Sequence, residues 1–205
     1  ISQHAFVEHL CAIKISESIT WEIPNHSARP VNILKNSLII TCVSVFLIIL
    51  FSSMAAYIFV RKAWKINQII FMVMLFSMVI PFQVVMIPLI SIYGGTFGIL
   101  NHRATLIFMH LGFSVSMAVF MFHGFIKGGV PISLEEAAQI DGANKVQLLR
   151  YVTIPMVMPS ITICTFLTLT NGFKLFDQNL ALTNGGPDKM SEMLALNIYY
   201  TFYGR

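Results

Sequence analysis

Charged residues are scarce in this chain of 205 residues, because Asp, Glu, Lys and Arg make up only 11% of it, against about 25% in an ordinary soluble domain. Apolar residues account for 56%. A disordered chain is excluded, since disorder requires few apolar groups and many charges, and a soluble enzyme is disfavoured. The net charge of +4 comes from 13 basic and 9 acidic residues scattered along the sequence, so no nucleic-acid partner is predicted.

Cysteine pairs and metal-ligand spacings are also lacking. The three cysteines, Cys11, Cys42 and Cys164, form no CxxC pair, and two of them lie in apolar runs, where a thiol behaves as a small hydrophobe. His110 and His123 fall about 220° apart around a helix at 100° per residue, so they do not share a face and are interpreted as structural. The methionine-rich runs are interpreted in the same way, and no metal site is predicted.

Long apolar runs are what the sequence does contain. Crossing a bilayer takes about 20 apolar residues, and four stretches are long enough: residues 36–60, about 66–92, 104–126 and about 151–173. Within lipid every backbone polar group must be satisfied internally, so these stretches are predicted to be helices. Pro81 and Pro88 in the second stretch, and Pro155 and Pro159 near the start of the fourth, predict kinks. The expected architecture is an all-α polytopic membrane bundle.

The basic loops give the predicted orientation. One group, Arg61, Lys62 and Lys65, follows the first span, and another, Lys127, Lys145 and Arg150, follows the third. Two spans separate the groups, so they share a side, which we predict to be the cytoplasm. Residues 127–150 then form a cytoplasmic loop, whereas residues 1–35 and 174–205 are external.

The two external segments carry further expectations. Residues 1–35 are too polar to be a span, and the first ten lack the basic start and apolar run of a signal peptide. Residues 191–205 carry Leu194, Ile198 and Phe202 at helical spacing, which predicts a helix that leads toward a further span. The Gly185-Gly186-Pro187 tripeptide predicts a tight external turn.

The cytoplasmic loop has clear helix signals. Ser133 and Glu136 have the spacing of a capping box, which predicts a helix that starts at Ser133. Gly142 can take the left-handed conformation that ends a helix. Asn144 with Gln147 offers a second start. Two short helices joined at a glycine are therefore predicted.

The surface of the first short helix leaves two alternatives open. Ala137 and Ala138 give it a smooth side that another protein can approach closely, and three acids, Glu135, Glu136 and Asp141, can pair with basic groups. This predicts a docking surface. The alternative is an amphipathic connector on lipid headgroups, although such connectors favour Lys and Arg on the polar face.

The same residues carry a family resemblance. Glu136-Ala137-Ala138, Gly142 and the Val152–Pro155 tetrapeptide follow the spacing EAA, x3, G, x9, I-x-L-P, which resembles the EAA motif of permease subunits of binding-protein-dependent ABC importers. Only Val152 and Ile154 depart from it, by aliphatic changes. Residues 80–143 are similar to the MalG-like permeases of the carbohydrate branch, and residues 182–196 resemble the T-x-G-G-P stretch of MalF-like and multiple-sugar permeases. The resemblance extends over residues 31–205.

This resemblance implies the type I ABC importer permease fold, with the first and last spans outside this chain. It also implies that the loop is a coupling helix seated in a cleft of a cytoplasmic ATPase, with contacts that we assign to Glu135, Glu136, Ala137, Ala138, Asp141 and Gly142. ATP and Mg would be bound by that partner, because this chain has no G-x-x-x-x-G-K-[ST] loop; no cofactor and no enzyme activity are expected in it. The other implied partners are a second, different permease subunit, an extracytoplasmic solute-binding protein and a sugar, in a bacterial or archaeal plasma membrane.

Polar residues within the spans are candidates for the transport path, because polar groups are costly in lipid. A neutral sugar requires hydroxyl and amide partners beside an aromatic face. Interhelical hydrogen bonding or plain packing is the alternative for each candidate. The candidates are Gln83, Ser114, Ser116, Thr168, Asn171, Phe173, Phe176 and Asp177.

Two other functions remain as alternatives. An ABC permease could carry glycerol 3-phosphate or a polyol, but a phosphate requires Arg or Lys in the path, and the interiors of the four spans offer none. An ion-coupled carrier or an intramembrane enzyme requires paired acids or a His-Asp array within the spans, and the sequence has neither.

Overall fold

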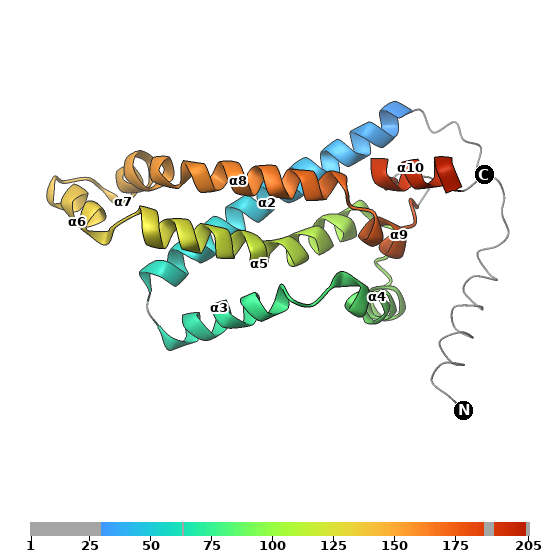
Figure 1. Ribbon diagram of the computed structural model, residues 1–205, viewed down its shortest axis with the longest axis horizontal. Helices are drawn as coiled ribbons and strands as arrows, with labels where there is room; N and C mark the ends of the chain where they lie inside the picture. The colour runs from blue at the N-terminus through green and yellow to red at the C-terminus, as the bar shows by residue number, and fades with distance from the viewer. Residues whose placement is uncertain (1–29, 63, 187–190, 204–205) are drawn as a thin grey trace.

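The protein is a bundle of helices. The structure, a computed structural model, describes residues 30–62, 64–186 and 191–203, and every regular element in these ranges is helical. The elements are α2 (Pro30–Arg61), α3 (Lys65–Ser77), α4 (Phe82–Ile90), the π-helical turn η1 (Ser91–Thr96), α5 (Arg103–Gly129), α6 (Ile132–Ile140), α7 (Lys145–Gln147), the π-helical turn η2 (Leu148–Thr153), α8 (Ile154–Phe173), α9 (Asp177–Leu182) and α10 (Leu194–Tyr203). Figure 1 shows α6 and α7 at one end of the bundle and α9 and α10 at the other. The predicted all-α fold is confirmed.

Three helices in the described ranges are long and apolar enough to cross a membrane, or up to four if the bent α3–α4 pair counts as one span. They are α2, α5 and α8 with the short turns before it. Since α2 begins at Pro30, residues 30–35 of the predicted external segment are helical and continuous with the first span, and residues 1–29 of that segment lie outside the described residues. The fourth span ends at Phe173, as predicted.

The second predicted span is not one kinked helix. It is divided into α3 and the α4–η1 pair, which meet at an angle of 97°. Pro81 has no N–H to donate and disfavours the helical conformation of the residue before it, so α3 ends in a turn in which Ile80 N donates to Ser77 O at 3.3 Å. Pro88 lies inside α4 without ending it. The break turns α4 toward the α9 end of the bundle (Figure 1).

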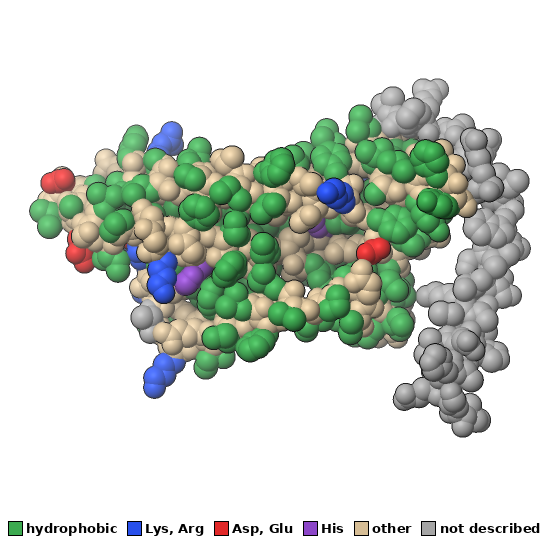
Figure 2. Space-filling model, viewed as in Figure 1, with side chains coloured by type: hydrophobic (Ala, Val, Ile, Leu, Met, Phe, Trp, Pro, Cys, Tyr) green, Lys and Arg blue, Asp and Glu red, His purple; other side chains and the backbone are tan. Residues whose placement is uncertain are grey.

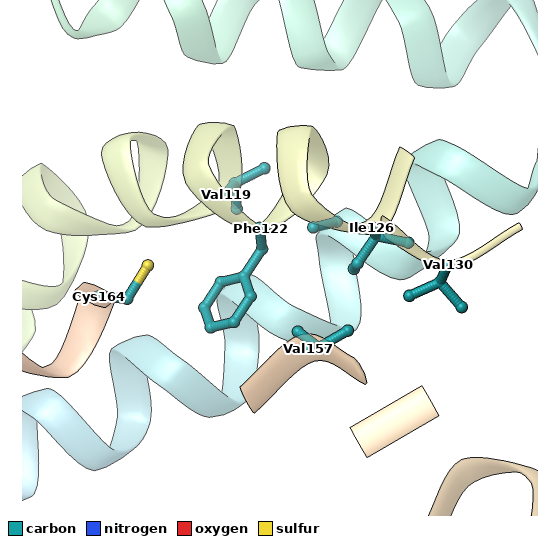
Figure 3. Close-up of a cluster of buried hydrophobic side chains, with 7 residues drawn as sticks. Val119, Phe122, Ile126, Val130, Val157 and Cys164 are labelled. Carbon is teal, nitrogen blue, oxygen red and sulfur yellow. The ribbon is translucent and has the colours of Figure 1, made fainter. Parts of the chain in front are cut away.

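The core lies where α2, α5 and α8 meet. Figure 3 shows the Phe122 ring of α5 directed toward α8, between Val157 and Cys164, and all three side chains are buried. Val119 and Ile126 extend the same face of α5, and Ala56 of α2 completes the cluster. Lipid tails are as apolar as these side chains, so close van der Waals packing rather than escape from water holds such helices together.

Apolar side chains are also exposed along the face of the bundle that Figure 2 shows. Less than half of the most apolar stretch of each long helix is buried inside the structure. On α2, the exposed apolar residues include Phe46, Phe51 and Met54. A surface of this composition suits lipid or further membrane helices, and not water.

Small and hydroxylated residues set the close approach of α2 to α8. Ser37, Thr41 and Ser44 form a fully buried row on α2. At Gly172 on α8, an added Cβ would lie 2.5 Å from Thr41 Cγ2 and 3.2 Å from Thr41 Oγ1. The two helices are therefore in contact at a point where only a glycine fits.

The end of the bundle that carries α9 and α10 is held together by hydrogen bonds. Asn179 of α9 is fully buried, and its Nδ2 donates to Ser191 O at 2.7 Å. Leu194 N, at the start of α10, donates to Ser37 Oγ of α2 at 2.8 Å. The predicted turn is present up to Gly186, with Gly185 at φ +84° and Gly186 N donating to Thr183 O at 2.7 Å; Pro187 lies outside the described residues. The predicted helix with Leu194, Ile198 and Phe202 is confirmed as α10.

The contact between Gly172 and Thr41 generates a stability prediction. We expect Gly172→Val to destabilise the purified protein by about 1–3 kcal/mol, because overpacking forces the two helices apart. Thermal unfolding in detergent measures the change. Gly124→Ala is the matched control, because its added Cβ meets nothing within 4 Å, and we expect it to leave the unfolding temperature equal or higher. Equal unfolding temperatures for Gly172→Val and the unaltered chain would contradict the prediction.

Candidate functional site

The loop between α5 and α8 has the predicted form of two short helices joined at Gly142. Gly142 has φ +87°, a conformation that strains any residue with a Cβ. The capping box at Asn144 and Gln147 is present, with bonds of 2.8 and 2.9 Å. The predicted start at Ser133 is wrong by one residue: α6 begins at Ile132 and has Pro131 as its N-cap, with no capping bond from a side chain. Ser133 therefore lies inside the first turn, where the predicted box cannot form.

We call α6, α7 and the turn between them the knob (residues 132–147). It stands at the end of the bundle, and Figure 2 shows acidic side chains gathered there. Ile140 is 86% exposed, and Leu134 and Val146 are also exposed. Glu136, Ala137, Asp141 and Gly142 are exposed as well, and Ala138 is half-buried. An exposed mixture of aliphatic and acidic side chains resembles the surface of a protein interface and not a lipid-lying helix rich in bases.

Glu135 differs from the rest of the knob because it is buried. Its Oε1 accepts a hydrogen bond from Arg61 Nη2 at 2.7 Å, and its Oε2 accepts one from the Tyr57 hydroxyl at 3.4 Å. Arg61 is the last residue of α2 and Glu135 lies in α6, so the two basic loops are at the same end of the bundle, as predicted. The Glu135 carboxylate is directed at α2 rather than at an outside partner.

A polar pocket of about 240 Å³ lies near the opposite end, between α4, α5, α8 and α9. This volume is below the roughly 300–1,000 Å³ of usual small-molecule sites, so the pocket is a partial site in this chain. Hydroxyl, amide, carboxylate and ammonium groups line it beside two phenyl rings. The lining residues are Phe82, His110, Ser114, Asn171, Lys174, Leu175, Phe176, Asp177 and Gln178.

Most of the predicted path residues gather at this pocket. Ser114, Asn171, Phe176 and Asp177 line it, and Gln83 Nε2 donates to Asp177 Oδ2 at 3.0 Å. Residues separated by 94 positions thus meet because the break at Pro81 turns α4 toward α9. Together they form a group of donors and acceptors beside the ring of Phe176.

The other three path candidates are not in the lining. Ser116 is hydrogen-bonded to Ser77 of α3 at 2.9 Å between their Oγ atoms. Thr168 Oγ1 donates to Cys164 O at 2.6 Å within α8, and Phe173 is half-buried beside the pocket residues. Ser116 thus makes a hydrogen bond between two helices, and Thr168 makes one within its own helix. These bonds favour interhelical hydrogen bonding for Ser116 and plain packing for Thr168.

Two lining residues are not among the predicted path residues: His110, which is interpreted above as structural, and Lys174. His110 is 3% exposed, its imidazole is hydrogen-bonded to the Thr168 backbone, and its Nε2 has no partner in the described part of the chain. His110 lies one helical turn before Ser114, and this i, i+4 spacing could have placed both on one face. Lys174, just past the last span, brings a cation to the pocket that the span interiors lack. His123 stacks on Phe71 with ring centroids 4.2 Å apart, which agrees with its interpretation as structural.

The pocket is suited to holding a polar solute. In the described ranges, no group of three His, Cys, Asp or Glu side chains is placed to hold a metal ion. Amide, hydroxyl and imidazole groups can exchange hydrogen bonds with hydroxyl groups of a ligand, and an aromatic face can cover its apolar side. The geometry therefore supports binding and orientation of a solute.

Comparison with known proteins identifies the family to which the chain belongs. A model of the family described as "Binding-protein-dependent transport system inner membrane component" matches residues 48–204. The probable starch degradation products transport system permease protein AmyC of Thermoanaerobacterium thermosulfurigenes is 38% identical over 171 residues, which cover 82% of this chain and 59% of AmyC. The AmyD protein of the same organism and of the same named system is 50% identical over 74 residues, or 36% of this chain and 25% of AmyD.

The fold also matches a solved structure. A chain of a bacterial ABC transporter involved in the import of the acidic polysaccharide alginate superposes with a TM-score of 0.69 at 19% identity, covering 87% of this chain and 61% of that chain. The present chain thus spans about 60% or less of the proteins that it matches. With its apolar spanning helices and a family match over three quarters of its length, this multi-pass membrane protein has the ABC importer permease fold and belongs to the family of binding-protein-dependent transport system inner membrane components.

Proposed function

We propose that the chain is a transmembrane permease subunit of an ATP-driven sugar importer. The observation that carries this proposal is the knob, a pair of short helices that stands outside the bundle with only Glu135 of α6 buried. The knob contains the EAA residues Glu136, Ala137, Ala138 and Gly142. Exposed aliphatic side chains rimmed by polar residues mark an interaction site, and the acidic rim of the knob favours a protein partner over lipid headgroups.

The partner at the knob is a cytoplasmic ATPase in this proposal. Ile140 and Leu134 supply the apolar contacts, Ala137 and Ala138 allow close approach, and Glu136 and Asp141 meet basic groups of the partner. Glu135 acts from inside by holding α6 in place. ATP and Mg are bound by the ATPase, since this sequence has no phosphate-binding loop. The knob then lies on the cytoplasmic side of a bacterial or archaeal plasma membrane, in agreement with the basic loops beside it.

The pocket supplies the solute site. Ser114, Asn171 and His110 offer hydrogen bonds to hydroxyl groups, and Phe176 offers a ring face. A second, different permease subunit would complete the partial site; that two proteins of one named system, AmyC and AmyD, both resemble this chain supports such a pair. An external solute-binding protein would deliver the sugar at the end formed by α9 and α10. Transport follows from alternating exposure of the pocket to the two sides.

A second candidate cargo is an anionic solute. Lys174 lines the pocket and can pair with a carboxylate or a phosphate, which brings back the alternative of glycerol 3-phosphate. Asp177 in the same lining opposes an anion, and for this reason a neutral sugar is the first choice. In reconstituted vesicles, glucose, maltose, maltotriose and glycerol 3-phosphate would be tested as competitors. If glycerol 3-phosphate alone competes, and Lys174→Gln abolishes this competition, an anionic solute replaces the neutral sugar as the first candidate cargo.

Ile140 tests the docking surface. We expect Ile140→Ser to weaken association with the ATPase roughly ten- to hundredfold, because burying an Ile side chain contributes about 1.5–3 kcal/mol. The measurement is co-purification of the ATPase over a range of concentrations. Val79→Ser is the matched control, since Val79 is similarly exposed but lies in the break between α3 and α4. Equal affinity of the two variants would remove the knob from the interface.

Gly142 tests the shape of the knob. A β-branched residue at φ +87° is strained, whereas Asn tolerates the left-handed conformation. We expect Gly142→Val to abolish most ATP-driven uptake and Gly142→Asn to retain more of it. Assembly with the ATPase and uptake of labelled maltose by vesicles are measured side by side. Full activity of Gly142→Val would contradict the assignment.

Two serines of α5 test the pocket. Ser114 lines it, while Ser116 is bonded to Ser77. We expect Ser114→Ala to raise the sugar concentration for half-maximal uptake about three- to tenfold, because a net hydrogen bond contributes about 0.5–1.5 kcal/mol. Ser116→Ala should leave that concentration unchanged and lower the unfolding temperature instead. The reverse pattern would place the path along Ser116.

A further inference from the structure

One ion pair joins a side chain of α6 to α2, while α6 also lies beside η2. Glu135 is the buried residue of α6, and its side chain and that of Arg61 are only 8% and 12% exposed. Arg61 Nη2 donates to Glu135 Oε1 at 2.7 Å and also to Val130 O at 2.9 Å, the carbonyl of the residue that caps the end of α5. The Tyr57 ring lies 5.6 Å from Arg61 Cζ, and its hydroxyl donates to the same carboxylate. One turn of α2 therefore holds both the end of α5 and the first turn of α6.

Such a contact resists separation. Charge-assisted hydrogen bonds are about twice as strong as neutral ones, and removing one partner of a buried pair leaves an uncompensated charge. The other residues of α6 lie exposed or half-buried, so Glu135 is the residue through which α2 resists a displacement of the knob. The displacement would then move α2, although α2 is distant in sequence from the knob. It would also move α5 and α8, which adjoin the knob along the chain.

The α2 helix extends from this contact to the external end. Its 32 residues make a rod about 48 Å long at 1.5 Å per residue, longer than the roughly 30 Å hydrocarbon core. Near the other end, Ser37 Oγ accepts the Leu194 N–H of α10, and Thr41 packs on Gly172 beside the pocket residue Asn171. One rigid helix thus contacts the knob, the pocket wall and the external helix.

We propose that the Arg61–Glu135 ion pair is the attachment through which the knob moves α2, and that Arg61 and Glu135 are positioning residues for ATP-driven transport. This inference rests on the proposed function, in which an ATPase displaces the knob. It assigns the route of the force to α2, which joins the ATPase side to the pocket and the external end.

The first experiment measures access to the pocket, so it does not require the identity of the sugar. In a chain whose native cysteines are replaced, Ser114→Cys reports labelling by a membrane-impermeant maleimide in the complete complex, with and without a non-hydrolysable ATP analogue. We expect Glu135→Gln and Arg61→Met to keep the ATPase bound but to reduce the nucleotide-dependent change in labelling rate about tenfold. Arg61→Lys, which keeps a cation at the pair, should retain most of the change. Lys65→Gln, an exposed base at the start of α3, is the control for loss of a charge and should respond as the unaltered chain does.

A second measurement uses chains that keep the ion pair and fold as before. Spin labels on two exposed residues, Ile58 of α2 and Ser133 of α6, report the distance between the two helices. We expect the same distance with and without the nucleotide analogue, because the helices move as one body. Addition of Arg61→Met should make the distance distribution broader or nucleotide-dependent.

The outcomes separate the two proposals. An unaltered complex that responds to nucleotide, with Arg61→Met and Glu135→Gln responding equally well, overturns the role of the ion pair and leaves the proposed function intact. A nucleotide-dependent distance between α2 and α6 in chains with the intact pair overturns it as well. Failure of Arg61→Lys to retain any response assigns the pair to folding only. Failure of the unaltered chain to bind the ATPase overturns the proposed function, and this inference with it.

Discussion

Close packing of α2, α5 and α8 is the constraint on which the other elements depend. Lipid gives no hydrophobic drive for helices to associate, so contact distance decides whether they stay together. Thr41 meets a glycine on α8, and Phe122 of α5 reaches across to Val157. A larger residue at Gly172 or a smaller one at Phe122 would alter the distances between these helices. The positions of the pocket and of the knob both depend on those distances.

The pocket and the knob lie at opposite ends of this frame, and each is held by contacts between distant segments. The pocket needs α4, which reaches Asp177 only because the chain breaks at Pro81. The knob needs α2, whose last residue pairs with Glu135. Both attachments are polar bonds at the margins of an apolar bundle. The Arg61–Glu135 bond is partly buried, so water competes less for it, whereas the Gln83–Asp177 bond is exposed.

Local features were predictable. The Asn144–Gln147 cap, the left-handed Gly142 and the end of the last span at Phe173 follow from neighbouring residues alone. The predicted cap at Ser133 is wrong because α6 begins one residue earlier, with Pro131 as its N-cap. Two local signals for the start of the helix competed. Five path candidates meet at the pocket. Nothing in their neighbouring residues distinguishes them from Ser116 and Thr168, whose hydroxyl groups are hydrogen-bonded inside the bundle. His110 was missed because its role depends on the vacant space next to it, which periodicity does not reveal.

By itself the sequence determined that the chain lies in a membrane, that its spans are helices and that a short acidic pair of helices joins two of them. These properties depend on composition, on run length and on bonds between residues a few positions apart. Only the tertiary structure decided that Glu135 faces α2 while Ile140 faces outward, and that Gln83 meets Asp177. Residues separated by more than 70 positions come together through helix packing and one sharp break, and no local pattern encodes the rotation of each helix about its own axis.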